Sequence, residues 1–407
     1  MSEQSGPSSS GVTEPGVVRL GVVRLGVVGA GGFGHFVRDA TVELPGLQVV
    51  AVTDTDPSQA AALAQLDGAR VHPDLASLLA DPGVDAVLLA LPPRDHAELT
   101  LAALAAGKAV FCEKPAGLTP DEVARVARAV DQTGLAYVVD RVVHHNPLVQ
   151  LLDRLRREGV LGRVQRFAFE NDAGDSDLHP AHWFWKPEIS GGILLEHAVH
   201  FFDVAALLVD SPAEQVQTMA ASRPDGRIDM VVSTVRHADG TLATHHHAFN
   251  HANPTERQLM RIDFGLAQAR LEGWIPLQLE LDAWLSADEL NTLRDVLDDG
   301  LTVPGYRTGP HQQVKLRVAE QPLDLHTRDE DLPDRFHVEL LVQLGRPEDK
   351  LAIYSECVRA VLTDFVAVVT TGSTPVTGIS QGAASVELAH AATLAQDGSV
   401  RPVVSLR

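Results

Sequence analysis

A glycine-rich loop near the N-terminus constrains the fold of this chain more than any other feature. Residues 29–34 read GAGGFG and directly follow an apolar run at 25–28, which predicts a strand, a tight turn and a helix in that order. In this pattern the glycines permit the turn, let a pyrophosphate approach the backbone and let the helix pack on the strand. The phosphates bind amides at the start of that helix. The sequence therefore predicts a dinucleotide site that includes Gly29, Gly31, Gly32, Phe33 and Gly34.

An acidic residue, Asp54, stands where the next predicted strand ends, about 20 residues after the last glycine of the loop. A carboxylate there accepts hydrogen bonds from a ribose 2′-hydroxyl and repels a 2′-phosphate. Neither Thr55 nor Asp56 offers a positive charge to such a phosphate. We therefore expect NAD rather than NADP, with Asp54 and Thr55 beside the cofactor. The alternative is that Asp54 is a turn residue before Asp56-Pro57.

Predicted strands and helices alternate along the first third of the chain. Apolar runs predict strands, and helical spacing of apolar residues predicts helices between them. The strands fall at 25–28, 47–53, 84–90, 109–112 and 135–139, and the helices at 57–66, 96–106 and 121–133. This alternation indicates a parallel sheet with helices on both faces. We expect residues 21–143 to form this α/β nucleotide-binding domain.

The remainder of the chain, 144–407, predicts a second domain of the α+β class. Strand-like segments follow one another after a helix, which indicates a large, mainly antiparallel sheet. The helix is expected at 147–158, and the strands at 163–170, 216–221, 230–237, 241–249, 258–264 and 269–272. The composition turns polar and charged over about 286–350, where we expect an insertion at the edge of the sheet. A last helix is expected at 351–371.

Composition and charge exclude several classes of partner. The chain of 407 residues is 45% hydrophobic, yet we find no run of about 18 uncharged apolar residues, so we expect a globular protein without a membrane span. The formal net charge of −21 would repel nucleic acid and anionic lipid. The two cysteines, Cys112 and Cys357, are too few for a disulfide framework and favour the cytoplasm. Residues 1–20, rich in Ser and Gly, predict a disordered tail; the pentapeptide GVVRL occurs at 16–20 and again at 21–25.

Three further segments make the chain recognisable. Glu113-Lys114-Pro115 follows the strand at 109–112, Leu91-Pro92-Pro93 precedes His96, and residues 190–203 read SGGILLEHAVHFFD. Together with the glycine loop they resemble the Gfo/Idh/MocA oxidoreductase family. The resemblance implies a Rossmann domain followed by a sheet domain, with substrate between the sheet and the nicotinamide, and a homo-oligomer, dimer or tetramer. It also implies cofactor contacts from Leu91, Pro92, His96, Glu113 and Lys114.

The resemblance assigns the chemistry to three residues. Lys114 should lie beside the reacting oxygen, His200 should transfer the proton, and Glu196 stands where the family usually has Asp. The side chains suit those roles, because removing a hydride from a carbinol requires a base near neutrality and a cation stabilises the alkoxide. Glu196 and His200 are four apart on a predicted helix, so they share one face. The carboxylate would orient the imidazole, contact the substrate, or both. Asp203 would reach the imidazole too, or anchor the helix.

Each of these residues has a structural alternative. A lysine before a proline is usually a solvated surface charge, and His200 beside Phe201 and Phe202 would be a core histidine. The joint context favours the catalytic roles. Ser190, where relatives often have glycine, and His144, where they often have arginine, depart from the family pattern, as Glu196 does, at positions that affect substrate recognition.

Histidines and tryptophans supply the remaining candidate residues. His245 and His247 alternate along a predicted strand and so share one face, which makes them candidates for binding substrate hydroxyls. Trp183 and Trp185 would wall the pocket or pack beneath the following glycine pair. Although imidazole suits zinc, we expect no metal site. The candidate substrate residues are His144, Trp183, Glu196, His197, His200, His245 and His247.

The sequence thus predicts an NAD-dependent dehydrogenase that interconverts a carbinol and a ketone on a sugar, cyclitol or related polyol. The first alternative is a redox-neutral enzyme that uses the same hydride step transiently, in cleaving glycosides or transferring oxygen. The second is a non-catalytic sensor that binds nucleotide and a partner protein. The presence of both Lys114 and His200 argues against a sensor, which has no need of a proton-transfer pair.

Overall fold

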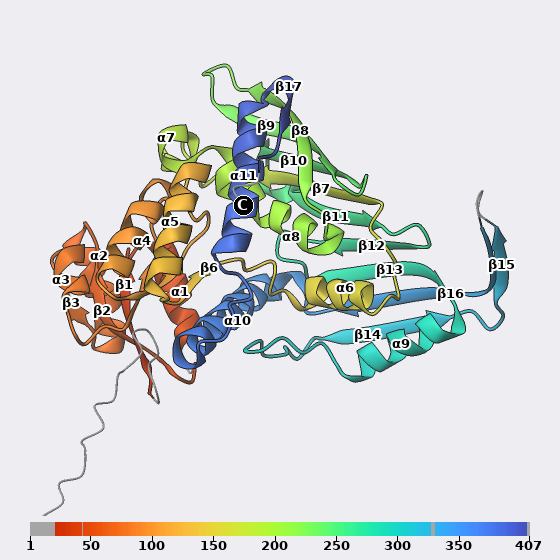
Figure 1. The fold of residues 1–407 in the computed structure, drawn as a ribbon, viewed down its shortest axis with the longest axis horizontal. Coiled ribbons are helices and arrows are strands. Elements are labelled where there is room, and N and C mark those ends of the chain that lie inside the picture. The colour runs from red at the N-terminus through yellow and green to blue at the C-terminus, as the bar shows by residue number, and fades with distance from the viewer. Residues whose placement is uncertain (1–20, 43, 327–329, 405–407) are drawn as a thin grey trace, which may run out of the picture.

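Two β-sheets form the framework of the protein, and helices pack around both (Figure 1). The computed structural model describes residues 21–42, 44–326 and 330–404. The expected disordered tail, 1–20, and the first copy of the repeated pentapeptide lie outside the described residues.

The first sheet is parallel throughout, with strand order β3-β2-β1-β4-β5-β6. Its strands are β1 (Val23–Val28), β2 (Leu47–Thr53), β3 (Arg70–Val71), β4 (Ala86–Leu89), β5 (Ala109–Cys112) and β6 (Tyr137–Val139). The helices between them are α1 (Gly32–Thr41), α2 (Pro57–Asp67), α3 (Leu75–Leu79), α4 (His96–Ala105) and α5 (Pro120–Thr133). The predicted Rossmann topology is confirmed. Only the short β3 and α3 were not predicted, because neither is long enough to show a period.

Local sequence signals explain where these helices begin and end. Helix α5 starts with a capping box, in which the Thr119 hydroxyl accepts from the amide of Glu122 and the Glu122 carboxylate accepts from the amide of Thr119. It ends at Gly134, whose φ of 63° is the left-handed conformation that glycine adopts without strain. Such caps fix the lengths of the helices, and so fix where the loops at the carboxyl ends of the strands leave the sheet.

The second sheet is larger and mainly antiparallel, as predicted. Its strand order is β14-β16-β13-β12-β11-β7-β10-β9-β8-β17, with β15 paired to β16, and β7–β10 is the parallel pair among the described strands. The first six strands are β7 (Arg166–Gly174), β8 (Ala213–Ser222), β9 (Ile228–His237), β10 (Leu242–His251), β11 (Arg257–Asp263) and β12 (Ala267–Glu272). The others are β13 (Gln278–Leu285), β14 (Gln313–Val318), β15 (Leu323–His326), β16 (Asp331–Gln343) and β17 (Asp397–Pro402).

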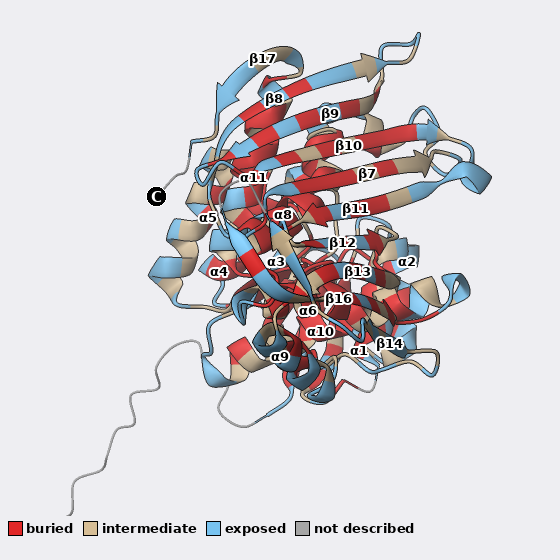
Figure 2. Ribbon diagram, turned by 90° about the vertical axis from the view of Figure 1, so that its right-hand side faces the viewer, coloured by how far each residue is buried: buried red, intermediate tan, exposed pale blue. Residues whose placement is uncertain are grey.

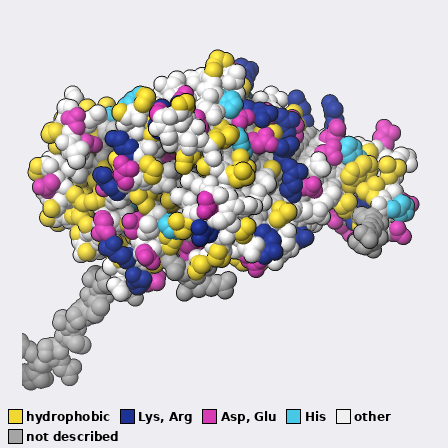
Figure 3. Space-filling view, turned by 90° about the horizontal axis from the view of Figure 1, so that it is seen from above, with side chains coloured by type: hydrophobic (Ala, Val, Ile, Leu, Met, Phe, Trp, Pro, Cys, Tyr) yellow, Lys and Arg dark blue, Asp and Glu magenta, His cyan; other side chains and the backbone are white. Residues whose placement is uncertain are grey.

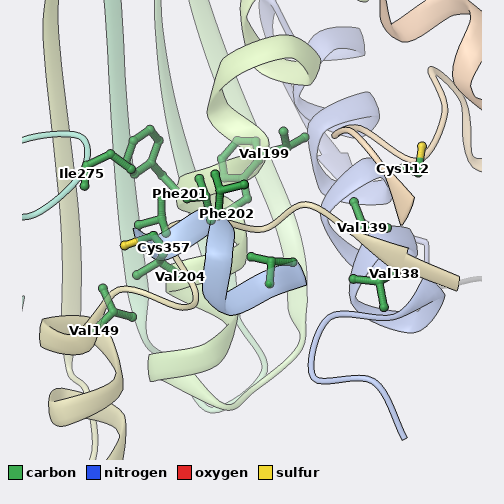
Figure 4. Close-up of a cluster of buried hydrophobic side chains, with 14 of the residues drawn as sticks. Cys112, Val138, Val139, Val149, Val199, Phe201, Phe202, Val204, Ile275 and Cys357 are labelled. Atoms are coloured by element: carbon green, nitrogen blue, oxygen red, sulfur yellow. The ribbon is translucent and has the colours of Figure 1, made fainter. Parts of the chain in front are cut away.

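One face of the second sheet is buried and the other is open. Buried and exposed residues alternate along neighbouring strands (Figure 2). Helices α6 (Pro147–Arg157), α8 (Val199–Val209) and α11 (Ile379–Leu394) lie on the buried side. Phe201 of α8 stacks on Phe169 of β7 with ring centroids 3.5 Å apart, and Figure 4 shows Phe201 and Phe202 in the core beside Ile275. The open face carries exposed apolar side chains, such as Met219 and Val232.

The polar segment 286–350 completes one edge of this sheet. It supplies α9 (Ala287–Asp298) and the strands β14, β15 and β16, of which β16 pairs along the whole of β13. Strand β13 itself was not predicted, and neither were α11 and β17. Helix α10 (Lys350–Thr371) matches the expected helix, but α11 follows it, so α10 is not the last helix.

Helix α10 returns to the first domain, although it was predicted to belong to the second. It packs against α1, β1 and β5. The guanidinium of Arg359 donates to the carbonyl of Val42 over 2.7 Å, and the Phe365 ring lies edge-on to Phe111 with centroids 5.7 Å apart. The first domain is therefore finished by residues from the far end of the chain.

Among the described residues, the stretch Pro187–Val209 is apolar and long enough to cross a membrane by length and composition alone. Its most apolar window is 67% buried inside the protein, and a buried core helix passes the same test. This stretch was not recognised as a candidate span from the sequence, because Glu196 and two histidines interrupt its run of apolar residues.

Candidate active site

A cavity of about 480 Å³ lies between the first sheet and the second domain. Its walls come from the loops that follow β1, β4 and β5, from the segment before α8, from the loop after β12 and from α10. Strands β1 and β4 are neighbours at the point where the strand order reverses, which is where doubly wound sheets bind ligands. The lining residues are Gly31, Gly32, Phe33, Ala90, Leu91, Pro92, Pro93, Glu113, Lys114, Trp183, Glu196, His197, His200, Trp274 and Tyr354.

The glycine loop forms one end of the cavity. Gly29 has φ of 97°, and a Cβ on it would lie 2.2 Å from the carbonyl oxygen of Ala90; a Cβ on Gly34 would lie 2.2 Å from the carbonyl oxygen of Gly29. These two positions therefore exclude every side chain. A Cβ on Gly31 or Gly32 would meet nothing within 4 Å, because both residues face open space.

The start of α1 fits a dinucleotide phosphate. Its N-cap is Gly31, and no side chain caps the helix, so the first-turn amides point toward the cavity end without a side-chain acceptor. Helix N-termini of this kind bind anions through those amides and the helix dipole. With the open space before Gly31 and Gly32, the loop has the shape and charge that the pyrophosphate of NAD requires.

Asp54 is fixed beside this loop at the end of β2. One carboxylate oxygen accepts from the amide of Ala30 over 2.7 Å, and the other accepts from the amide of Asp56 over 2.7 Å. Thr55 is exposed. Neither Asp54 nor Thr55 lines the cavity, so their contacts with a ribose remain predictions.

His96 does not line the cavity, which corrects the expectation that it contacts the cofactor directly. It is fully buried at the start of α4. Its Nδ1 lies 2.7 Å from the carbonyl oxygen of Pro115, and its Nε2 lies 2.8 Å from that of Leu91. The ring thus holds together the two loops that carry Leu91, Pro92 and Lys114.

Lys114 and Glu196 meet across the cavity. The Lys114 ammonium donates to Glu196 Oε1 over 2.7 Å and to the Glu196 carbonyl oxygen over 2.6 Å, and each side chain is 16% exposed. Burial alone would raise the pKa of Glu196, but the positive charge and hydrogen bond of Lys114, together with the nearby imidazoles, outweigh burial and lower it. The sequence left open whether Glu196 orients the imidazole or contacts the substrate; the structure pairs it with Lys114.

His200 lies in the first turn of α8, on the same cavity. Residues Leu194–Ala198 form a π-helical turn ahead of α8, and this turn brings both Glu196 and His200 to the wall. Burial, followed by the charge of Lys114, lowers the pKa of His200 well below its ordinary value. Its imidazole is therefore neutral near pH 7 and able to accept a proton. Burial lowers the pKa of the adjacent His197 to about 4, so that ring is neutral as well.

Two carboxyl groups lie directly behind Lys114. Cys112 of β5 is in register with Val139 of β6, which places the next residues, Glu113 and Asp140, side by side. Both are buried, and burial raises the pKa of each. The neighbouring carboxylate raises the pKa of Glu113 further, since two close buried carboxyls cannot both ionise cheaply. Sequence reasoning treated Glu113 only as a cofactor contact and missed Asp140.

His144, which stands where relatives often have arginine, belongs to a buried network outside the cavity. It therefore does not lie where a substrate in the cavity would contact it. Asp203 of α8 accepts from the Arg141 guanidinium over 2.9 Å and lies 3.2 Å from His144 Nδ1. Arg141 also donates to the Gln381 carbonyl over 2.8 Å. Asp203 therefore anchors α8, as the second of the two predicted roles had it, and the anchor fixes the turn that carries His200.

His245 and His247 are also corrected. Both lie on the buried face of β10 with no exposed surface, and neither lines the cavity. They are packed among phenylalanines: the His245 ring is 4.6 Å from Phe202, and the His247 ring is 5.3 Å from Phe169. The alternation along the strand was predicted correctly, but the face they share packs against α8 instead of opening to the cleft.

Aromatic side chains complete the cavity. Trp183 lines it, whereas Trp185 lies between Arg223 and Arg227, each 5.2 Å from its ring. Tyr354 of α10 and Trp274 also line it, with ring centroids 4.8 Å apart, and both were missed as site residues. No signal used in the sequence analysis places either side chain at the site.

No group of His, Cys, Asp and Glu in the described part of the chain has the geometry to hold a metal ion. Cys112 and Cys357 are free, buried thiols.

Two family profiles match consecutive parts of the chain. One, described as the oxidoreductase family with an NAD-binding Rossmann fold, matches residues 23–141, and one for the GFO/IDH/MocA C-terminal domain matches residues 149–264. Together they cover more than half of the chain, and they agree with the two sheets of the structure.

Individual relatives share this similarity. An inositol 2-dehydrogenase from Acidothermus cellulolyticus is 35% identical over 201 residues, which are 48% of this chain and 56% of that protein. A 1,5-anhydro-D-fructose reductase from Ensifer adhaerens is 31% identical over 51% of this chain and 64% of its own length. The chain thus matches little more than half the length of these curated relatives.

A solved structure of levoglucosan dehydrogenase, in complex with NADH and L-sorbose, has a TM-score of 0.74 with 18% identity and covers 95% of this chain and 100% of its own. At that identity the likeness shows the shared fold. Because both family profiles match, the chain belongs to the Gfo/Idh/MocA oxidoreductase family.

Proposed function

We propose that the protein is an NAD-dependent dehydrogenase that interconverts a carbinol and a ketone on a sugar, cyclitol or related polyol. One observation carries the proposal: Lys114 and a neutral, buried His200 line the same cavity as the open glycine loop. The relatives named inositol dehydrogenase and anhydrofructose reductase agree with it.

His200, Lys114 and Glu196 have separate roles in the proposed reaction. NAD held at the glycine loop would supply the acceptor for the hydride that leaves the carbinol carbon. The imidazole of His200 takes the hydroxyl proton as the carbon–oxygen double bond forms, so the alcohol loses one hydride and one proton and becomes a ketone. Lys114 donates to the substrate oxygen and stabilises its developing negative charge. Glu196 holds the ammonium in place through two hydrogen bonds.

The test measures NADH formation with inositols, aldoses and polyols, with NADP in parallel. We expect turnover with NAD for at least one of them, and loss of turnover in Lys114→Met and His200→Asn while NAD still binds. Activity that survived both substitutions would show that the assigned roles are wrong. Turnover without net NADH, with cofactor retained through gel filtration, would favour the redox-neutral alternative.

The remaining proposals concern partners and location. We propose a homo-oligomer formed through the open face of the second sheet, which carries exposed apolar residues such as Met219 and Val232; light scattering would test it. We propose no nucleic-acid or membrane partner, since the formal net charge is −21 and acidic side chains lie among the basic ones on the face seen in Figure 3. The two free thiols suit the cytoplasm.

A further inference from the structure

The cavity wall has few positively charged side chains. Of its fifteen lining residues, all within the described chain, Lys114 is the only lysine or arginine. Sites that bind carboxylate or phosphate groups normally present arginine forks, several cations or free backbone amides to them. Here the free amides lie at the glycine loop, at the end of the cavity that suits a cofactor pyrophosphate.

The one cation is already paired. Of the three N–H groups of the Lys114 ammonium, two donate to Glu196 Oε1 and to the Glu196 carbonyl oxygen, at 2.7 and 2.6 Å. The third is free to donate to a substrate hydroxyl. Because a carboxylate in direct contact balances its charge, Lys114 can stabilise the reacting oxygen through this N–H but adds little net positive charge to hold a separate anionic substituent.

A second negative charge lies behind this pair. Glu113 and Asp140 are both buried, and Glu113 Oε1 and Asp140 Oδ1 have no hydrogen-bond partner within the described chain. Burial and the neighbouring carboxylate raise the pKa of Glu113 well above its ordinary value, whereas burial raises the pKa of Asp140 to about 6, so near pH 7 Glu113 holds a proton and Asp140 carries one negative charge. Because Asp140 lies beside Glu113, which lines the cavity, that charge acts on a ligand with little solvent to screen it.

The two imidazoles in the cavity wall add no positive charge near pH 7. His197 and His200 line the cavity, and burial lowers the pKa of both, so neither is a cation near pH 7. The rest of the wall is aromatic or aliphatic, with Trp183, Trp274 and Tyr354 offering flat apolar faces to the C–H face of a ring.

We propose that the cavity selects an uncharged polyhydroxyl ring and rejects the same ring when it carries a carboxylate, a phosphate or a nucleotide. The inference rests on the proposed function for the identity of the site, and it narrows the substrate class by charge. The specificity-determining residues are Glu196, Glu113 and Asp140, of which Asp140 acts through its neighbour Glu113.

The experiment separates charge from shape. Glucuronamide and glucuronate have nearly the same size and differ by one negative charge. Each is titrated by calorimetry into the protein loaded with NADH, and each is assayed for turnover with NAD, after neutral aldoses, inositols and polyols have been screened in the same way. We expect the amide to be preferred by about 100-fold or more, because a like charge placed at a desolvated site is strongly unfavourable.

A variant pair tests the cause. Glu113→Gln combined with Asp140→Asn removes the buried charge with little change in shape, and it should narrow the preference for the amide by about tenfold. Asp131→Asn removes one exposed carboxylate on α5 and serves as the matched control, which should leave the preference unchanged.

The outcomes are distinct. Glucuronate bound as tightly as its amide, no neutral ring bound at all, or an unchanged preference in the folded double variant would each overturn the inference. If the double variant fails to fold, the wild-type preference alone decides. Neutral rings that bind without NADH formation would contradict the proposed dehydrogenase while leaving the charge selectivity standing.

Discussion

A buried histidine, His245, should make the protein sensitive to mild acid in a measurable way. Its side chain has no exposed surface, and its ring lies between Phe167 and Phe202, with centroids 5.4 and 4.6 Å away. Neither ring nitrogen has a hydrogen-bond partner among the described residues. Burial lowers the pKa of His245 to about 3. In the unfolded chain the same group has a pKa of about 6.5.

The sign and size of the effect follow from this difference. Between pH 6.5 and about 3 the unfolded state binds a proton that the folded state does not, so stability is fully present above pH 6.5 and is lost as the pH falls. At pH 5.5 the unfolded histidine is about ten-elevenths protonated, and the loss is about 1.4 kcal/mol. This value does not depend on the exact folded pKa, provided that it lies well below 5.5.

The assay compares free energies of unfolding in urea at pH 8 and pH 5.5 for the wild type and His245→Leu. The difference between the two pH values should be smaller in the variant by about 1.4 kcal/mol. His179→Leu, which removes an imidazole that is already exposed, is the control and should behave as the wild type does. An equal pH dependence in wild type and His245→Leu would refute the reasoning, since it would mean that the buried ring takes up its proton in the folded state.

Three further perturbations have defined outcomes. Gly29→Ala places a Cβ 2.2 Å from the carbonyl oxygen of Ala90, so we expect a lower melting temperature and weaker NAD binding; unchanged values by thermal unfolding and NAD titration would contradict the loop geometry. Arg141→Met leaves the buried Asp203 without its guanidinium and should cost about 3–5 kcal/mol in urea unfolding. A loss below about 1 kcal/mol would show that the network does not anchor α8. Asp54→Ser should reduce the ratio of NAD to NADP kcat/KM at least about tenfold, and an unchanged ratio would remove Asp54 from cofactor selection.

Most of the first domain was predictable because its signals are local and repeated. The glycine loop, five of the six strands and the helices between them each follow from a few consecutive residues. The second sheet was correctly predicted to be large and mainly antiparallel, but β13 and β17 were missed, and the segment that holds β14, β15 and β16 was expected only as an insertion, without assigned strands. Strand β17 is mostly exposed and polar, so it lacks the apolar alternation that marks a half-buried strand.

The site was less predictable, because it depends on which faces meet. Lys114, Glu196 and His200 were found from their segments, yet the pairing of Glu196 with Lys114 joins residues 82 apart and has no signal in either segment. For His245 and His247, the spacing along β10 correctly predicted that they share one face of the sheet. It could not predict that α8 covers that face. Tyr354 reaches the cavity only because α10 crosses back to the first domain.

That return of α10 has a consequence for how the protein is made. The sheet of the nucleotide-binding domain is encoded in the first 143 residues, but Phe111 and the carbonyl of Val42 find their partners, Phe365 and Arg359, more than 200 residues later. At a synthesis rate of about 5–20 residues per second, the emerging domain waits on the order of ten seconds or more for them. During that interval the surface that α10 will cover stays without its partner, so the domain that is synthesised first is also among the last parts of the protein to be completed.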